Sequence, residues 1–383
     1  MLQICNNIKK YKQIIAFLIF FGLSSGIFTS IHMNIIIKEL TMNKLSKIGL
    51  SALCGSLAAI SSASAGDLTV TGGANATYTS EDNATTGNPL GMASAVTFKG
   101  TGELDNGTTF ALTLDSTDQD AYSAGQIVMT TPSMGTFAFD QGAGGRGIDR
   151  LDDKMPTAWE ETDGTGIGAG LQTVSGIGGS QAIEWGAPSD MMPDGVSLYL
   201  GYTPKAGQSL INDKASGGTG VENKGSGWDL VVEHSGLMDG LNAFAGYSQV
   251  EQFVDNTNDG DQTEYALGAT YAVGSVTVGY QYTRSNRQPG SSTGGEVEYY
   301  ENNAYGVSFN VNDDLSLSYG VHTSDVSKSG AADVELEATS LQIAYSMGGA
   351  TIKIAETSID NASYQTGAAF DKDGTSMMLS LAF

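Results

Sequence analysis

The sequence predicts an all-β protein: a transmembrane antiparallel β-barrel of sixteen strands with one long loop folded inward as a constriction. Three observations lead to this prediction. Segments of about ten residues place a large apolar residue at every second position, which gives a strand one oily and one small or polar face. The connections between these segments alternate between short and long. After the first 65 residues, no stretch holds the roughly 18 apolar residues of a spanning helix.

The first 65 residues read as export signals. Residues 42–65 have a charged start, an apolar stretch and an Ala-Ser-Ala end, which is the layout of a cleaved secretory signal. Residues 1–41 carry a second apolar run behind three lysines, which we interpret as an upstream mis-start rather than an uncleaved membrane anchor. We therefore expect one domain, the barrel, over residues 66–383.

The expected mature part is acidic and lacks cysteine. The first 65 of the 383 residues contain six of the 18 basic and one of the 42 acidic residues, so 12 basic and 41 acidic residues remain. Both cysteines, Cys5 and Cys54, lie in the leader, which excludes disulfides and thiolate metal sites from the barrel. So acidic a surface repels nucleic acid, which we exclude as a partner.

The period-two pattern marks the strands along the chain. Tyrosines lie near the ends of several segments, as in the aromatic girdles of membrane barrels, and the last segment stops on an aromatic residue. The clearest segments are Val196–Tyr202, Trp228–Val232, Tyr265–Val273, Val276–Tyr282, Tyr305–Val311, Leu315–Val321, Leu341–Met347 and Met377–Phe383.

The connections sort into two sets, as expected when one end of a barrel has tight turns and the other has long loops. The short set is Asp105–Gly107, Pro132–Gly135, Met238–Gly240, Gly274, Asp313–Asp314 and Gly348–Gly349. The long set is Glu81–Leu90, Gln141–Ser180, Lys205–Ser226, Val254–Gln262, Arg287–Glu298, Lys328–Asp333 and Asp360–Lys372. The strands between them number sixteen, with both chain ends on the short-turn side.

These features together resemble a Gram-negative general porin. The resemblance runs from "GDLTVTGGANATYTS" at Gly66 through the "AIEW" strand and its Pro188 turn to Phe383. It implies a homotrimer in the Gram-negative outer membrane, in contact with lipopolysaccharide, that passes ions and small hydrophilic solutes. It also implies that Phe383 is the assembly signal read by the barrel-insertion machinery.

The connection Gln141–Ser180 is the candidate constriction. A loop this long is unusual in a compact domain unless it is functional, and its glycines allow it to bend away from the preceding strand. The resemblance implies that the loop after the fifth strand folds into the barrel; a solvated external loop is the alternative. The charged residues expected at the constriction are Arg146, Asp149, Arg150, Asp152, Asp153, Lys154, Glu160 and Glu161.

Strand alternation adds charged residues of the wall to this site. We expect the side chains of Lys99, Asp115, Asp140, Glu184, Asp229, Glu233 and Lys353 to point into the lumen. The arginine ladder usual in the family is missing, because none of the four arginines falls on a lumen-facing position of the first four strands. They are Arg146, Arg150, Arg284 and Arg287. Acidic groups dominate, which predicts a passive pore that prefers cations.

Two other functions of the same architecture stay open. A substrate-specific channel needs a row of lumen aromatics, whereas the sequence predicts only Tyr199 and Phe244 to point inward. A structural or adhesive surface barrel needs no open lumen. An enzyme is not expected, because His234 and Ser235 are adjacent in a strand and point to opposite faces.

No cofactor is expected apart from a structural ion. The acidic turn with Asp255, Asp259 and Asp261 resembles a calcium loop, but Thr257 occupies the third ligand position and the twelfth position has no glutamate. It is a weak candidate for Ca²⁺ or Mg²⁺ that would bridge the protein to lipopolysaccharide.

Overall fold

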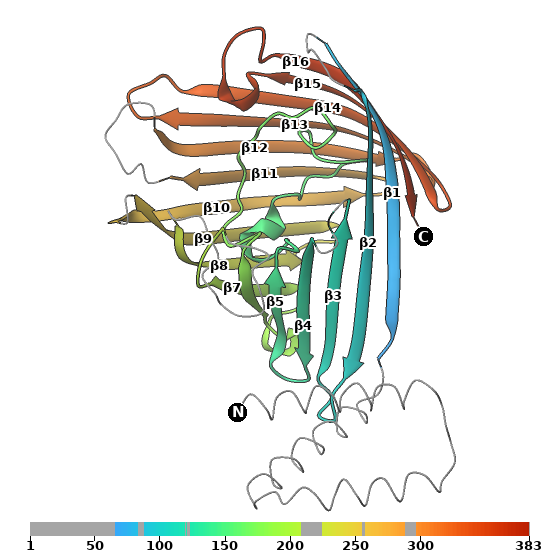
Figure 1. Cartoon of the computed structure of the whole chain (residues 1–383), viewed down its shortest axis with the longest axis vertical. Coiled ribbons are helices and arrows are strands. Elements are labelled where there is room, and N and C mark those ends of the chain that lie inside the picture. Colours follow the sequence, from blue (N-terminus) through green and yellow to red (C-terminus); the bar gives the residue numbers. More distant parts are fainter. Residues whose placement is uncertain are drawn as a thin grey trace, which may run out of the picture. The chain divides into compact units, whose positions relative to one another are not determined.

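The computed structural model describes residues 66–82, 88–118, 120, 123–207, 224–254, 257–287 and 296–382. Within them, sixteen antiparallel strands close into a single barrel in which β1 pairs with β16 (Figure 1). This confirms the predicted fold class. The strands are β1 Leu68–Glu81, β2 Leu90–Glu103, β3 Thr109–Thr117, β4 Ala124–Thr131, β5 Gly135–Gln141, β6 Gln181–Gly186, β7 Val196–Thr203, β8 Lys224–Ser235, β9 Leu241–Val254, β10 Thr257–Val273, β11 Val276–Asn286, β12 Val297–Asn310, β13 Leu315–Lys328, β14 Val334–Met347, β15 Ala350–Asp360 and β16 Lys372–Ala382.

The alternation of side chains along the strands follows the sequence pattern. In β16, Met377, Leu379 and Leu381 are 45%, 40% and 48% exposed on the outer face, whereas Ser376 is 2% exposed on the inner face. Large apolar side chains on the outside fit contact with lipid hydrocarbon, and the small or polar ones face the interior. No helix among the described residues is long and apolar enough to cross a membrane.

One predicted loop is wrong. The segment Val254–Gln262 is expected from its Asn, Asp and Gly content to be a long connection, yet β9 runs to Val254 and β10 begins at Thr257. The two strands continue as a paired hairpin with a register shift between Asn258 and Gly260. Ladder hydrogen bonds outweigh the low strand propensity of these residues.

Inside the barrel, the segment between β5 and β6 packs on the inner wall with two apolar clusters. We call residues 142–180 the β5–β6 loop; it is the long green connection in Figure 1. Ile148, Leu151 and Val174 of the loop pack with Val231 and Phe244 of the wall. A second cluster joins the loop to the wall and to the β15–β16 connection, and its members are Ile167, Ala169, Val326, Leu336, Ala338, Ile359, Ala362 and Tyr364. Burying each large apolar side chain contributes about 1.5–3 kcal/mol, so these clusters favour the docked loop.

Candidate pore constriction

The β5–β6 loop leaves the wall through a run of glycines. Gly142, Gly144, Gly145 and Gly147 have φ values of 77°, 75°, 65° and 60°, in the left-handed region that only glycine adopts at little cost. Gly147 is further constrained, because a Cβ there would lie 2.1 Å from Oδ2 of Asp229. The chain therefore turns inward and forms the short 3₁₀ helix η1, Gly147–Leu151, against the wall.

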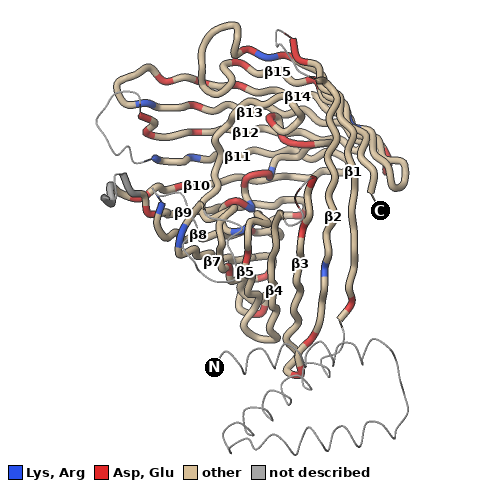
Figure 2. Tube along the Cα trace, viewed as in Figure 1, with Lys and Arg blue, Asp and Glu red and all other residues tan. Residues whose placement is uncertain are grey.

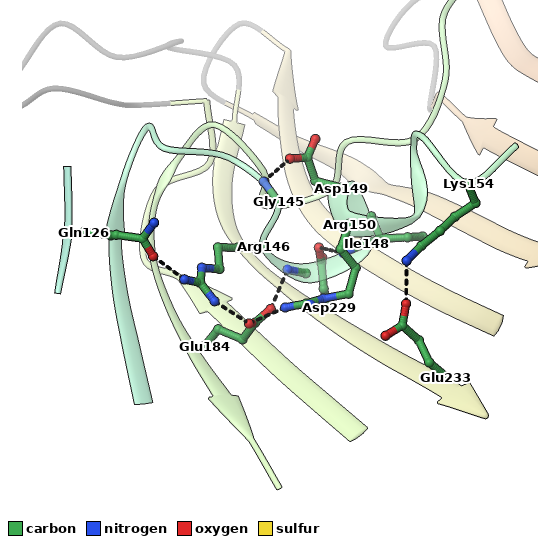
Figure 3. Close-up of polar contacts among 11 residues, drawn as sticks. Gln126, Gly145, Arg146, Ile148, Asp149, Arg150, Lys154, Glu184, Asp229 and Glu233 are labelled. Carbon is green, nitrogen blue, oxygen red and sulfur yellow. Dashed lines mark hydrogen bonds and ion pairs between the residues drawn. The ribbon is translucent and has the colours of Figure 1, made fainter. Parts of the chain in front are cut away.

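Glu184 of β6 is the first anchor of the loop (Figure 3). Its Oε2 accepts a hydrogen bond from Gly147 N at 2.7 Å, and its Oε1 pairs with the guanidinium of Arg146 at 3.2 Å. Arg150 forms a second ion pair with Oε1. The side chain is only 3% exposed. The carboxylate thus faces inward as expected, but the loop covers it.

Two further wall carboxylates accept hydrogen bonds from backbone N–H groups of the loop. Oδ2 of Asp229 in β8 accepts from Ile148 N at 2.8 Å and from Ile177 N at 3.1 Å, and so links the two limbs of the loop. Oε2 of Glu264 in β10 accepts from Ser175 N at 2.8 Å and from Gly176 N at 2.6 Å. Both wall side chains are at most 1% exposed. Both carboxylates therefore hold the loop against the wall.

The middle of the loop reaches the other side of the barrel. Oε1 of Gln342 in β14 accepts from Trp159 N at 2.9 Å and from Glu160 N at 3.2 Å, while its Nε2 donates to Glu160 O at 2.6 Å. Thr165 and Thr357 of β15 share a hydroxyl hydrogen bond of 2.7 Å. Because the loop bonds inward-facing groups from β6 to β15, the structure places it against the inner wall.

The β15–β16 connection closes over the last part of the loop. Ser363 N donates to Ala169 O at 2.7 Å, and Gln172 N donates to the Tyr364 hydroxyl at 3.0 Å. Tyr364 in turn shares a 2.7 Å hydrogen bond with Ser324 of β13. These contacts link the last part of the loop to the β15–β16 connection and, through Tyr364, to β13.

The charges of the loop divide into paired cations and unpaired carboxylates. Arg146 and Arg150 pair with Glu184, and Lys154 pairs with Glu233 of β8 at 2.6 Å. In the described part of the chain, the carboxylates of the loop form no ion pair with any basic group within 4 Å. They are Asp149, Asp152, Asp153, Glu160, Glu161 and Asp163.

Burial and mutual repulsion hold protons on several of these carboxyls. Burial raises the pKa of Asp152 to about 7, and the carboxylates of Asp153 and Asp149 add to the shift. Burial also raises the pKa of Glu161 to about 9, together with a hydrogen bond to Glu160 and the charge of Asp153. The pKa values of Asp149 and Asp163 are raised mainly by burial as well. The negative charge of the loop therefore grows as the pH rises past neutrality.

The remaining predicted lumen residues lie on the inner face of their strands. Lys99 of β2, Asp115 of β3 and Lys353 of β15 are on the face opposite to the exposed Phe98, Leu112 and Ile352. Asp115 accepts a 2.6 Å hydrogen bond from the Thr97 hydroxyl. Asp140 of β5 is inward and 1% exposed. Figure 2 shows how few basic residues the strands carry in comparison with acidic ones.

The two predicted inward aromatics lie beneath the loop. The Arg150 guanidinium stacks 3.7 Å from the centre of the Tyr199 ring, and Phe244 is 5% exposed in the apolar cluster with Ile148. The two rings therefore do not form a row of aromatic side chains along an open passage. Stacking of a sugar on these aromatics is thus obstructed by the loop.

Several proposed residues cannot be placed in this site. Phe383 and Asp255 lie outside the described residues, as does the expected signal sequence, and the side chain of Asp259 is not described. Asp261 lies in β10, where its carboxylate accepts a hydrogen bond from the Gln249 amide. The described residues contain no group of three or more His, Cys, Asp or Glu side chains suited to a metal ion.

Glu264 and Gln342 anchor the loop but were not among the expected site residues. Both follow the alternation of side chains along their strands and lie on the inner face, beside the outward Tyr265 and Leu341. A buried acidic residue at an inward position of a barrel strand is the signal that could have identified Glu264, because such a group needs hydrogen-bond donors. Gln342 gives no comparable signal, since neutral polar residues are common on inner walls.

A closed barrel of sixteen antiparallel strands with a loop bonded to its inner wall defines a channel-forming outer-membrane barrel. The chain belongs to the Gram-negative porin family, whose model matches residues 49–361. It is accordingly a protein of the Gram-negative outer membrane. Porins are typically channels rather than enzymes.

Solved porins share this fold at low sequence identity. OmpF of Salmonella typhi, solved in complex with daunomycin, is 14% identical with a TM-score of 0.63 over 83% of this chain and 98% of that one. OmpT of Vibrio cholerae is 14% identical with a TM-score of 0.59, over 84% and 98% of the two chains. The anion-selective porin from Comamonas acidovorans is 17% identical with a TM-score of 0.57, over 83% and 99%. No curated protein matches this chain in sequence.

Proposed function

We propose that this porin is a water-filled channel for passive diffusion of ions and small hydrophilic solutes, that its β5–β6 loop forms the constriction, and that it prefers cations. The observation that supports the preference is the division of charge in the loop. Its three basic side chains are ion-paired with the two wall carboxylates of Glu184 and Glu233, whereas its six carboxylates form no ion pair with a basic side chain among the described residues. Charge at the narrowest point decides which ions pass most easily.

The wall away from the anchors adds little positive charge to oppose this effect. Strands β1 to β4 carry Lys99 as their one basic residue. Arg146 reaches Gln126 of β4, but it is also paired with Glu184. A porin of similar fold is described as anion-selective, so the shared barrel does not by itself fix the sign of the selectivity.

A substrate-specific channel is the second candidate, and the covered positions of Tyr199 and Phe244 argue against it. No observation favours an adhesive barrel. We also propose that the chain has no enzymatic activity, in line with the opposite facing of His234 and Ser235 at the end of β8.

The reversal potential of the channel in a planar bilayer under a salt gradient tests the proposed selectivity. We expect a cation-selective sign that weakens when Asp149, Asp152 and Asp153 are changed together to Asn. Changing Asp255, Asp259 and Asp261 to Asn removes the same formal charge outside the loop and should have less effect. An anion-selective sign, or equal effects of the two triple substitutions, would contradict the proposal.

The assembly partners belong to the same proposal. On the outer face of β1, small residues at Gly72, Ala74 and Ala76 alternate with inward positions and allow a neighbouring barrel to approach closely. We infer a homotrimer packed through the first strands, and one structure of Vibrio cholerae OmpT is described as a trimer form. Contact with lipopolysaccharide and recognition of Phe383 by the barrel-insertion machinery complete the expected set.

A further inference from the structure

The connection between β15 and β16, residues 361–371, has an unusual backbone (Figure 1). Among the described residues, four that are not glycine have φ in the left-handed region, and three of these lie within four positions of this connection. They are Asn361, Ser363 and Tyr364, with φ values of 57°, 55° and 56°. A side chain in this region crowds the backbone, so each residue is strained, and asparagine is strained least. We call residues 361–364 the clamp.

Contacts with the β5–β6 loop hold the clamp in this conformation. Ser363 N donates to Ala169 O at 2.7 Å, and the Tyr364 hydroxyl accepts a hydrogen bond from Gln172 N at 3.0 Å. The two segments approach closely, since a Cβ at Gly170 would lie 2.6 Å from Oγ of Ser363. A strained backbone persists only where the surrounding structure over-determines it. The bonds to the loop supply this constraint.

The wall holds the side chain of Tyr364 from two strands. Its hydroxyl shares a 2.7 Å hydrogen bond with Ser324 of β13, and the centre of its ring lies 5.1 Å from that of Tyr300 of β12. Tyr364 is 6% exposed, in the apolar cluster that includes Ile167 of the loop. One side chain thus joins the loop to β12 and β13, so its position influences where this part of the loop lies.

The part of the loop that the clamp contacts lies between two other anchors. On one side Thr165 shares a hydroxyl hydrogen bond with Thr357, and on the other side Ser175 N donates to Glu264. Between these anchors, two wall side chains also donate to carbonyl groups of residues 166–174, at 3.0 and 3.1 Å. Movement of this segment therefore requires the loss of few hydrogen bonds and leaves both anchors intact.

We propose that the clamp sets the width of the constriction through Tyr364, a positioning residue, and that it has two states. In the closed state the clamp is strained and bonded to the loop, as in this structure. In the released state its backbone relaxes, Tyr364 leaves the apolar cluster and residues 166–174 leave the wall. Strain favours release and the bonds favour closure, so the channel should show a second conductance level. This inference rests on the proposed function, because it takes the β5–β6 loop as the constriction.

Single-channel recording of the full barrel in a planar bilayer tests the strain. Ser363→Gly removes the side chain from a left-handed residue and keeps the N–H group that donates to Ala169 O. We expect the time in the second level to fall severalfold, although the greater freedom of glycine in the released state offsets part of the gain. Ala331→Gly, in the exposed β13–β14 connection where φ is not positive, is the matched control and should change nothing. An increase or no change in Ser363→Gly would overturn the proposal of a strained clamp.

Tyr364→Phe tests the positioning role. The substitution removes the hydroxyl that binds Gln172 N and Ser324 and leaves the ring in the apolar cluster. We expect the time in the second level to rise roughly fivefold, as for the loss of a neutral hydrogen bond, and adding Ser363→Gly should reduce it again. Tyr319→Phe on the exposed outer face of β13 is the matched control, and thermal unfolding should be similar in both single variants. Equal times in the second level for Tyr364→Phe and the control would overturn the role of Tyr364.

Hydrogen exchange of the detergent-purified barrel, measured by mass spectrometry, separates this inference from the proposed function. Release of the clamp should raise the exchange of backbone N–H groups in residues 166–174 of Tyr364→Phe relative to Tyr319→Phe, and should leave exchange in η1 unchanged. Faster exchange without any change in conductance would refute the loop as the constriction, and with it the proposed function alone. Unchanged exchange and conductance in a cation-selective channel would refute the clamp alone.

Discussion

Replacing Glu264 by Gln should loosen the β5–β6 loop without unfolding the barrel. The carboxylate accepts four hydrogen bonds: Oε2 from Ser175 N and Gly176 N, and Oε1 from Gln262 Nε2 at 2.6 Å and the Ser285 hydroxyl at 2.8 Å. A glutamine has one acceptor oxygen and one NH₂ donor. It can therefore satisfy only one of the two pairs of donors.

The magnitude follows from the better of the two orientations. If the amide oxygen faces the loop, both loop hydrogen bonds survive as neutral bonds, each weaker by about 1 kcal/mol than a bond to a carboxylate. The NH₂ group then meets Gln262, whose own oxygen is held by Arg287 at 2.8 Å and is not free to turn. That conflict adds about 1 kcal/mol. The docked loop should lose about 2–3 kcal/mol, which raises the undocked fraction roughly 30- to 150-fold.

Single-channel recording in a planar bilayer measures this fraction as the time spent outside the main conductance level. Glu335→Gln is the matched control, because Glu335 is exposed on the outer face of β14 and forms no side-chain bond with the loop. Thermal unfolding should differ little between the two variants, since the strand ladder is intact in both. Current fluctuations in Glu264→Gln that equal those of the control would refute the role of Glu264 as an anchor.

Four further predictions concern ion selectivity, loop docking, biogenesis and assembly. Cation selectivity should increase from pH 6 to pH 10 as Asp152 and Glu161 ionise, with pKa values of about 7 and 9; a reversal potential independent of pH would contradict their place at the constriction. Because burial raises the pKa of Asp152 to about 7 in the docked loop, the docked loop binds more protons than the undocked loop between about pH 4 and 7, so loop docking should weaken as the pH rises through that window. Deletion of Phe383 should lower the level of the barrel in the outer membrane more than its thermal stability, because one interfacial ring contributes only about 1.5–3 kcal/mol; unchanged membrane levels would contradict its role as a signal. Ala74→Arg on the outer face of β1 should yield monomers in mild detergent, and a trimer of unchanged stability would exclude this face from the interface.

The inward positions of the wall were predictable because pleating forces period two on every strand. Asp229, Glu233 and Lys353 were assigned to the inner face from alternation alone, and the structure places them there. The turns of the short set were predictable for a related reason, since each falls where the alternation stops. Local rules of this kind act within one strand or one turn.

The contacts of the loop were not predictable in the same way. Trp159 and Gln342 are 183 residues apart, and Ser175 and Glu264 are 89 apart. Which inward polar residue meets which backbone N–H depends on the path of the loop across the barrel, and no local pattern encodes that path. The prediction of a long connection at Val254–Gln262 was wrong for the opposite reason, because local polarity was given more weight than strand pairing.

The contacts of the loop bear on which acidic groups can set the ion selectivity. Glu184, Asp229 and Glu264 of the wall are covered by the loop and are engaged with its arginines and N–H groups. A buried carboxylate with several charge-assisted partners contributes little field to the open lumen. We therefore expect the wall acids to determine where the loop lies, and the unpaired carboxylates of the loop to determine the sign of the ion selectivity. It follows that Gln342→Leu, which removes loop hydrogen bonds without changing any charge, should alter the conductance by moving the loop while the channel keeps its preference for cations. Neutralising Asp149, Asp152 and Asp153 should instead weaken the preference with little change in loop position. The reverse pattern in conductance and reversal potential would show that the wall carries the selectivity.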